Sequence, residues 1–218
     1  MVTICGIDEA GRGPILGPLV ICGVSVDQKD HEKFRKIGAK DSKLLTSKQR
    51  ENLVFGIHEI AKEYKLITVN PEEIDAAVTN PGSNLNWLEA DKAIQIIDAL
   101  KPDEVYLDCP SPNIPAFTEY VHTRLKHKTK LHCAHHADRD YPVVSAASIL
   151  AKVNRDAQIE EIKKKIGVDF GSGYGHDPKT IPFIEKYWAK YPLLFRHSWK
   201  NYQAQVNKMK QGKLDQYG

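Results

Sequence analysis

The stretch ICGIDEAGRGP, residues 4–14, ends an apolar run with two adjacent acids and then a glycine-rich turn. Its Ile-rich first half predicts a strand at residues 2–8. Asp8 and Glu9 close this strand, where burial would cost the two carboxylates their hydration unless cations or hydrogen bonds compensate. A divalent metal is one such compensation, because hard cations take carboxylate oxygens as ligands. For this pair taken alone, a strand end that turns into solvent is the simpler interpretation.

Outward from this stretch, the sequence predicts strands that alternate with helices. We expect further strands at residues 19–26, 66–69, 104–108 and 130–134, and helices at residues 33–36, 46–64, 84–100, 114–125 and 142–166. Gln49 follows Thr46 by three residues, so a capping box is expected to open the second of these helices. From about residue 171 the chain holds several prolines and aromatics, which favours a small helical appendage. This order predicts an α/β layered fold with a mixed sheet.

The bulk composition limits the class of protein. A chain of 218 residues with 41% hydrophobic residues is enough for one large domain, or for one domain with an appendage. The four cysteines lie far apart in the sequence, which favours a reduced, intracellular compartment. We expect no secretory leader and no membrane-spanning segment, and therefore a cytoplasmic protein.

The net charge of +3 hides an asymmetry between the two halves of the chain. From position 120 onward Lys and Arg outnumber Asp and Glu by nine, whereas positions 1–119 carry a net charge of −6. A basic excess in one half favours a polyanionic partner such as nucleic acid. A solvated basic face is the alternative that charge alone leaves open.

Acidic residues recur at the predicted strand ends. Asp108 closes the strand at residues 104–108, and Asp138 follows the strand at residues 130–134. Sites in α/β sheets form where strands end, so these acids and Asp8 are expected to converge around one or two Mg²⁺ or Mn²⁺ ions. Glu9 could join them only if the strand ends or bulges after Asp8, because successive strand side chains point to opposite faces.

Two other motifs give weaker indications of a binding site. The histidines His132, His135 and His136 do not have the spacing of a zinc site, since the first two would lie on opposite faces of a continuing strand. The turn GRG at residues 11–13 does not match a P-loop. It could let backbone amides approach a phosphate or a ribose, or it could be only a tight turn.

Four long blocks of sequence together resemble one known family. The runs GIDEAGRGP (residues 6–14), KDSKL (40–44), YPVVSAASILAKV (141–153) and DFGSGY (169–174) resemble, in this order, the signatures of the type 2 ribonuclease H family, ribonuclease HII, in its archaeal form. The chain departs from the usual pattern at His136, where the family has Lys, and at Gly175 and His176, where it has Pro-Ser.

The resemblance implies a fold, domains and a set of site residues. It implies a ribonuclease H-like catalytic domain at residues 1–170, a C-terminal helical substrate-binding region at residues 171–210 and a tail at residues 211–218. The implied catalytic and metal-binding acids are Asp8, Glu9, Asp108 and Asp138, with two divalent ions, Mn²⁺ or Mg²⁺. The implied substrate-binding residues are Gly11, Arg12 and Gly13, which would read the ribose 2′-hydroxyl, and Tyr174, which would stack on the next sugar. Lys43, Lys152, Arg155 and Lys200 are further candidates for phosphate contacts, with a solvated surface as the alternative.

The implied activity is hydrolysis of the RNA strand of RNA–DNA hybrids, and of duplex DNA at embedded ribonucleotides, leaving 3′-hydroxyl and 5′-phosphate ends. We expect a monomer. In the tail, Gln211, Leu214 and Tyr217 resemble the motif by which clients bind the sliding clamp, PCNA, although a frayed terminus would also account for this short pattern. The sequence leaves two rival classes open: another carboxylate nuclease, such as a resolvase or an exonuclease, and a non-catalytic module that binds hybrids.

Overall fold

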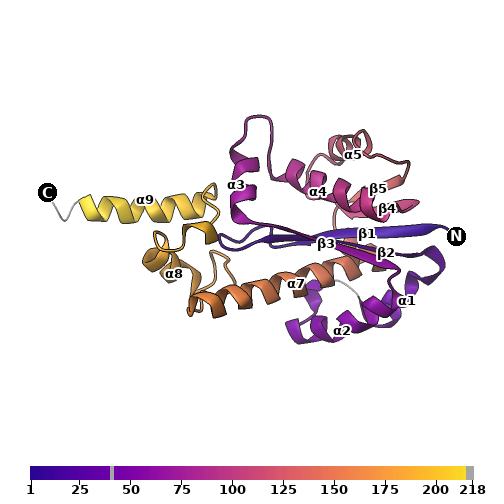
Figure 1. Ribbon diagram of the computed structural model, residues 1–218, viewed down its shortest axis with the longest axis horizontal. Coiled ribbons are helices and arrows are strands. Elements are labelled where there is room, and N and C mark those ends of the chain that lie inside the picture. The colour runs from indigo at the N-terminus through magenta and orange to yellow at the C-terminus, as the bar shows by residue number, and fades with distance from the viewer. Residues whose placement is uncertain (40–41, 215–218) are drawn as a thin grey trace. The chain divides into compact units, whose positions relative to one another are not determined.

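The computed structural model describes residues 1–39 and 42–214, without the side chains of residues 43 and 212–214. The strands are β1 (Thr3–Ala10), β2 (Leu19–Asp27), β3 (Glu63–Val69), β4 (Glu104–Asp108) and β5 (Lys130–Ala134) (Figure 1). The helices are α1 (Glu32–Lys36), α2 (Ser47–Ile60), α3 (Pro71–Thr79), α4 (Leu85–Leu100), α5 (Ile114–His122), α6 (Ala137–Asp140), α7 (Pro142–Ile166), α8 (Thr180–Tyr187) and α9 (Lys200–Leu214). Short 3₁₀ helices lie at Gln28–Asp30, Ser42–Leu44 and Pro192–Leu194.

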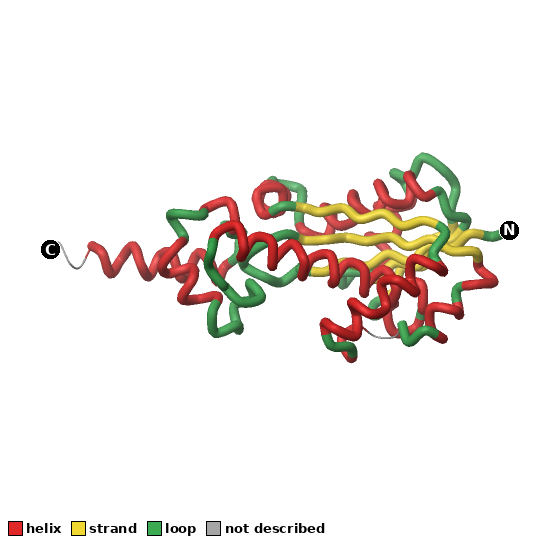
Figure 2. Tube along the Cα trace, turned by 60° about the horizontal axis from the view of Figure 1, so that its bottom comes forward, coloured by secondary structure: helices red, strands yellow, loops and turns green. Residues whose placement is uncertain are grey.

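The strands lie side by side in one mixed sheet (Figure 2), and their order is β3-β2-β1-β4-β5. β1 pairs antiparallel with β2, and it pairs parallel with β4, which in turn pairs parallel with β5. The carboxyl ends of β1, β4 and β5 therefore meet at one edge of the sheet. The predicted α/β class with a mixed sheet is confirmed, and so is the expected meeting of the strand ends that carry the acids.

The chain divides into two compact units. The sheet unit comprises residues 1–10, 20–68 and 85–155, and the turn unit comprises residues 11–19, 69–84 and 156–218. The implied division at residues 170 and 210 stays a prediction about substrate binding, because the compact units follow different boundaries. In particular, the glycine-rich turn belongs to the unit that holds the C-terminal helices.

Helices cover both faces of the sheet in the sheet unit: α4 and α5 one face, and α1, α2 and the first part of α7 the other (Figure 1). β1 and α7 approach closely at Gly6, where a Cβ atom would lie 2.4 Å from the carbonyl carbon and oxygen of Val143. Only glycine fits at this contact between two backbones. On the α4 face, the space above Gly23 is filled by the side chain of Ile96.

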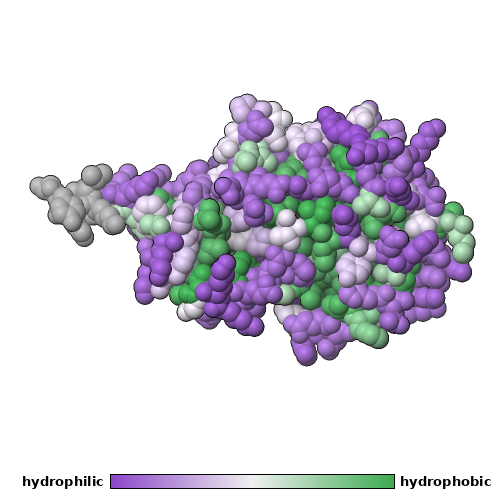
Figure 3. Space-filling model, viewed as in Figure 1, coloured by the Kyte–Doolittle hydropathy of each residue, from purple (hydrophilic) through white to green (hydrophobic). Residues whose placement is uncertain are grey.

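The turn unit has a separate aromatic core. Phe170, Phe183 and Phe195 are buried there together with Leu16, which forms an isolated antiparallel bridge to Phe195. Figure 3 shows hydrophobic side chains gathered over the strands of the sheet unit and, in the turn unit, around α8. Among the described residues, no helix has both the length and the apolar character needed to cross a membrane.

The helix that was expected to run from residue 46 to residue 64 is shorter than predicted. Its capping box is confirmed, since Gln49 N donates to Thr46 Oγ1 at 3.2 Å and Thr46 N donates to Gln49 Oε1 at 2.8 Å. The helix ends at Ile60, because Lys62 N donates to Ser25 O at 2.8 Å and the chain then continues as β3 beside β2.

Helix α3 was not predicted at all. Its signals are local: Pro71 stands at the first helical position, and Asn70 caps the helix by accepting a hydrogen bond from Glu73 N at 2.9 Å. The expected helix at residues 142–166 is confirmed as α7, with the predicted bounds.

Candidate active site

Asp8 lies near the end of β1 and faces α7. Strand side chains alternate, so Asp8 shares the face of Gly6, which contacts the first turn of α7. The Asp8 side chain is only 5% exposed. Burial raises the pKa of the Asp8 carboxyl to about 7. The charge of Lys152 and a hydrogen bond from Ser148 act in the opposite direction, and the carboxylate of Asp108 adds to the increase in pKa.

A small polar network in the sheet unit holds Lys152 beside Asp8. Lys152 Nζ donates to Ser148 Oγ at 2.7 Å, one helical turn earlier on α7. It also donates to the hydroxyl of Ser42, which lies 2.8 Å from Ser148 Oγ. Sequence reasoning assigned Lys152 to the substrate phosphates and overlooked both serines. The i, i+4 spacing of Ser148 and Lys152 on a helix was the signal that could have found the network.

Glu9 points to the opposite face of the sheet. The pairing of β1 with β2 runs without interruption through Asp8 and Cys22, Glu9 and Ile21, and Ala10 and Val20. The strand therefore has neither the end nor the bulge that would turn both acids to one side. Glu9 lines a small cavity on the α4 face together with Asp108 and Glu89. Its backbone amide donates to Asp8 Oδ1 at 2.7 Å.

Asp108 and Asp138 are connected through helix α6. Asp108 Oδ1 accepts a hydrogen bond from Ala137 N at 2.9 Å, at the first residue of that helix. Asp138 is the next residue and is 2% exposed. His136 precedes α6 in a left-handed conformation, with φ of 59°, and so turns the chain into the helix. The hydrogen bond from Ala137 to Asp108, at the end of β4, thereby fixes the position of the neighbouring Asp138.

The acids fit a hard divalent cation by their chemistry. Carboxylate oxygens are the ligands that Mg²⁺ and Mn²⁺ prefer, and the pKa of about 7 shows that the charge of Lys152 compensates only in part for the burial of Asp8 beside a second carboxylate. Within residues 1–39 and 42–214, however, no three Asp, Glu, His or Cys side chains are already arranged as a closed metal cluster. The residues thus provide suitable ligands along one edge of the sheet without a preformed cage.

The histidines, for which the sequence predicted no zinc site, make other contacts. His132 Nε2 lies 2.9 Å from Glu104 Oε2, and its ring stacks on Tyr106 at 4.6 Å between centroids. His135 Nδ1 lies 3.0 Å from the carbonyl oxygen of Cys109. These two side chains therefore serve the neighbourhood of β4 and β5.

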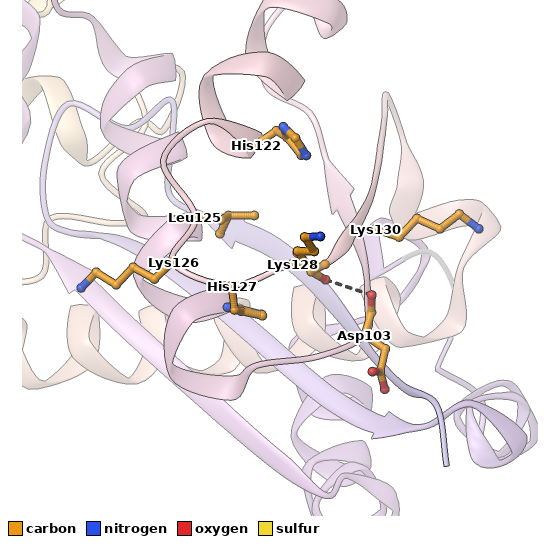
Figure 4. A pocket seen from close by; sticks show the side chains of 8 residues that line it. Asp103, His122, Leu125, Lys126, His127, Lys128 and Lys130 are labelled. Carbon is orange, nitrogen blue, oxygen red and sulfur yellow. Dashed lines mark hydrogen bonds between the residues drawn. The ribbon is translucent and has the colours of Figure 1, made fainter.

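A larger cavity of about 630 Å³ lies at the other edge of the sheet (Figure 4). Asp103, just before β4, and Lys130, at the start of β5, belong to its lining. The remaining lining residues come from the segment before β5 and are His122, Leu125, Lys126, His127, Lys128 and Thr129. Because β4 and β5 are parallel, this basic cavity and the acids lie at opposite ends of the strands. It is therefore no part of the acidic site.

The turn unit brings together the GRG turn and Tyr174. Gly11 has a φ of 90°, which favours glycine, and Gly13 is exposed. A Cβ atom at Gly13 would lie 3.4 Å from the ring of Tyr174, so ring and backbone are in contact. Tyr174 is half-buried and its ring lies 5.4 Å from that of His176. Two segments separated by about 160 residues in the sequence are thus neighbours, and the substrate contacts that the resemblance implies for them stay predictions.

The remaining predicted contacts are placed as follows. Lys200 is exposed at the first residue of α9, whereas Arg155 is 5% exposed, which leaves its guanidinium little access to a phosphate. The side chains of Lys43 and Leu214, and all of Tyr217, lie outside the described residues, so the contacts assigned to them stay predictions. Gln211 is exposed near the end of α9.

Comparison with known proteins gives consistent matches along most of the chain. The family model described as ribonuclease HII matches residues 5–202. A ribonuclease HII of Pyrococcus furiosus is 48% identical over 204 residues, which cover 91% of this chain and 89% of that protein. The crystal structure of ribonuclease H2 from Pyrococcus horikoshii has a TM-score of 0.87 and 38% identity, covering 96% of this chain and 99% of that one. The structure of a PCNA:RNase HII complex from Archaeoglobus fulgidus has a TM-score of 0.77 and 37% identity, covering 85% and 87%.

Proposed function

Because this chain belongs to the ribonuclease HII family, we propose that the acids at its strand ends form the active site of an endoribonuclease. The family makes the chain a divalent-metal-dependent hydrolase that acts on RNA–DNA hybrids. We propose further that it cuts duplex DNA at embedded ribonucleotides and leaves 3′-hydroxyl and 5′-phosphate ends. The observation that carries the proposal is the buried Asp8 carboxyl beside Asp108, at the edge where β1 and β4 end.

Asp8, Glu9, Asp108 and Asp138 are the proposed ligands of two Mg²⁺ or Mn²⁺ ions. Bound by these carboxylates, such ions would supply an activated water and positive charge for the scissile phosphate. Asp8 is the proposed shared ligand, since it lies beside Asp108 and is oriented by its contacts with Ser148 and the amide of Glu9. Lys152 provides a positive charge behind Asp8, which favours the ionised carboxylate that a cation requires.

We propose that the GRG turn and Tyr174 recognise the ribose at the cut site. The exposed backbone of Gly13 lets a sugar approach closely, and the 2′-hydroxyl is the group that distinguishes RNA from DNA. The aromatic face of Tyr174 beside it offers a surface on which the neighbouring sugar can pack. Lys200, exposed on α9, is the proposed phosphate contact that fits best among the described candidates.

A single cleavage assay tests this function. The substrate is a labelled DNA duplex with one ribonucleotide, incubated with Mg²⁺, with Mn²⁺ or with a chelator, and the products are mapped. Asp8→Asn should nearly abolish cleavage and leave hybrid binding largely intact. Asp103→Asn is the matched control, because Asp103 stands at the opposite end of β4 and accepts a hydrogen bond from Thr3 N at 2.7 Å.

Three results would contradict the proposal. Full activity of the Asp8→Asn variant would show that the metal ligands are elsewhere. Equal cutting of an all-DNA duplex would favour another carboxylate nuclease, such as a resolvase or an exonuclease. Binding of the hybrid without any cleavage, in Mg²⁺ and in Mn²⁺, would favour the non-catalytic module that only binds hybrids.

We also propose that the protein is a monomer whose tail binds a sliding clamp, PCNA. Support comes from the tail pattern of Gln211, Leu214 and Tyr217, and from the Archaeoglobus fulgidus relative that was solved with PCNA. Truncation after Lys210 should abolish capture by immobilised clamp and spare cleavage of naked substrate. Lys213→Ala is the matched control in the full chain, since it alters the tail without touching the motif. Undiminished capture of the truncated protein would exclude the tail.

A further inference from the structure

Arg196 is the largest side chain in the described part of the chain that is completely buried, with 0% exposure. It belongs to the turn unit and follows Phe195 in the loop before α9. An arginine keeps its charge under all ordinary conditions, so its burial is costly unless the guanidinium is well hydrogen-bonded. A side chain of this kind therefore requires a structural or a functional reason.

The hydrogen bonds of the guanidinium converge on one short segment of the chain. Nη2 donates to the carbonyl oxygen of Gly11 at 2.6 Å, and Nη1 donates to that of Arg12 at 2.9 Å. Nη2 and Nε both donate to the carbonyl oxygen of Gly17, at 3.0 and 3.2 Å. The planar guanidinium thus holds the carbonyl oxygens of Gly11, Arg12 and Gly17 at the same time.

These contacts determine where the amides of the turn point. In a planar trans peptide the carbonyl and the N–H point in opposite directions. The carbonyl of Gly11 shares its peptide with the N–H of Arg12, and the carbonyl of Arg12 shares its peptide with the N–H of Gly13. Since both carbonyls are directed at Arg196, both amides are directed away from it. The bond to the carbonyl of Gly17 orients no amide, because the next residue, Pro18, has no N–H.

The loop that carries Arg196 is itself fixed. Arg196 N donates to the carbonyl oxygen of Ile15 at 2.9 Å, which ties the backbone of the arginine to the same turn. Asp75 accepts hydrogen bonds from His197 N at 2.7 Å and from Ser198 N at 2.9 Å. The backbone around Arg196 is therefore fixed by hydrogen bonds, and the guanidinium is held in place against the turn.

We infer that Arg196 is a positioning residue for ribose recognition: it fixes the amides of Arg12 and Gly13 toward the substrate and makes them stronger donors. The second effect follows because a buried positive charge behind the two carbonyls polarises their peptides in a low-dielectric surrounding. This inference rests on the proposed function of the GRG turn. It adds a residue that never touches the nucleic acid and yet sets the selectivity for RNA.

The test compares Arg196→Lys with Thr180→Val. Lysine keeps the charge but lacks the rigid planar fork of N–H donors with which the guanidinium spans the three carbonyls. Thr180→Val is the matched control for stability, because it removes a buried hydrogen bond of 3.0 Å to the carbonyl oxygen of Phe170 elsewhere in the turn unit. Both variants are assayed well below their melting temperatures on a duplex with one ribonucleotide. Mn²⁺ binding is measured in parallel by calorimetry.

We expect Arg196→Lys to lower kcat on this duplex by about 10²-fold, as small misplacements of substrate-positioning groups do. Mn²⁺ affinity and KM should change little, and Thr180→Val should keep nearly full kcat. The ¹H–¹⁵N resonances of Arg12 and Gly13 should shift in Arg196→Lys and stay in place in Thr180→Val. Wild-type kcat for Arg196→Lys, or a loss that Thr180→Val reproduces, would overturn the inference.

A second measurement uses only the wild-type protein and covers the case in which Arg196→Lys does not fold. When the non-hydrolysed duplex is added in Ca²⁺, the amides of Arg12 and Gly13 should shift with a ribonucleotide at the site and not with a deoxyribonucleotide. Absence of this difference would overturn the inference. Failure of the wild-type protein to cut any hybrid would instead remove the proposed function, while the resonance shifts would still report whether Arg196 orients the turn.

Discussion

Replacing Gly6 with alanine tests how the packing of β1 against α7 holds Asp8 in place. The added Cβ would lie 2.4 Å from the carbonyl carbon and oxygen of Val143, and 2.5 Å from the amide nitrogen of Val144. All three are backbone atoms in the first turn of a helix, so no side chain can rotate away. β1 and α7 must separate by about 1 Å to restore an ordinary contact distance.

The size of the effect follows from this geometry. Overpacking of a core costs typically about 1–3 kcal/mol, and a contact between two backbones belongs at the upper end of that range. For a chain of this length, about 3 kcal/mol corresponds to a fall in Tm of roughly 6–12 °C. Asp8 is two residues further on the same face, so it moves with the strand. A displacement of about 1 Å of a catalytic group costs on the order of 10²-fold in rate.

The assay pairs Gly6→Ala with Gly56→Ala. At Gly56 in α2 the one tight contact of the added Cβ would be with the terminal Cδ1 of Ile37, at 3.1 Å, and that side chain can give way. Alanine is the better helix former by about 1 kcal/mol, so this control should be neutral or stabilising. Tm and hybrid cleavage are measured for both variants. Equal Tm values, or a Gly6→Ala variant that is destabilised but cleaves at the wild-type rate, would refute the reasoning.

Three further predictions concern stability and reactivity. Hydrogen bonds from the amides of Lys179 and Ser172 lower the pKa of Asp177, so its stabilisation is present above the usual carboxyl pKa and is lost as the pH falls through the lowered value. Asp177→Asn should therefore lower Tm at about pH 6, and its difference from wild type should shrink as the pH falls through the lowered pKa, as thermal unfolding across pH would show. Burial raises the pKa of the Cys5 thiol to about 12, so this thiol should react with a disulfide reagent only after unfolding; rapid labelling of the native protein would contradict its burial. Thr46→Ala should cost about 1 kcal/mol by removing the cap of α2, and an unchanged denaturation midpoint would show that the cap contributes nothing.

The sheet and the edge that carries the acids could be predicted from the sequence because each rests on a local signal. Short apolar runs indicated the strands, and Asp8 and Asp108 each stand at the end of such a run. The parallel pairing of β1 with β4 then brings the two ends together without any further information. The same local signals placed α7 and the capping box of α2 correctly.

The turn unit could not be predicted, since its residues meet only in three dimensions. Residues 11–19 follow directly on β1 in the sequence and yet pack with segments that begin at residues 69 and 156. Arg196 has no local pattern that distinguishes it from a surface arginine. Its burial and its four hydrogen bonds become visible only when Phe195 and Leu16 bridge the two segments.

The opposite orientations of Asp8 and Glu9 show why the sequence left the acidic site incomplete. Alternation alone required the two side chains to diverge unless the strand was interrupted, and the ladder to β2 runs on through Ala10. Asp108 is close to both acids: its charge raises the pKa of the Asp8 carboxyl, and its side chain lines the same small cavity as Glu9. If the acids hold cations as we propose, the edge of the sheet at the end of β4 is the place where ligands from both faces would reach one centre. No bulge in β1 is required for this, because a cation at the edge can be approached from above and below the sheet.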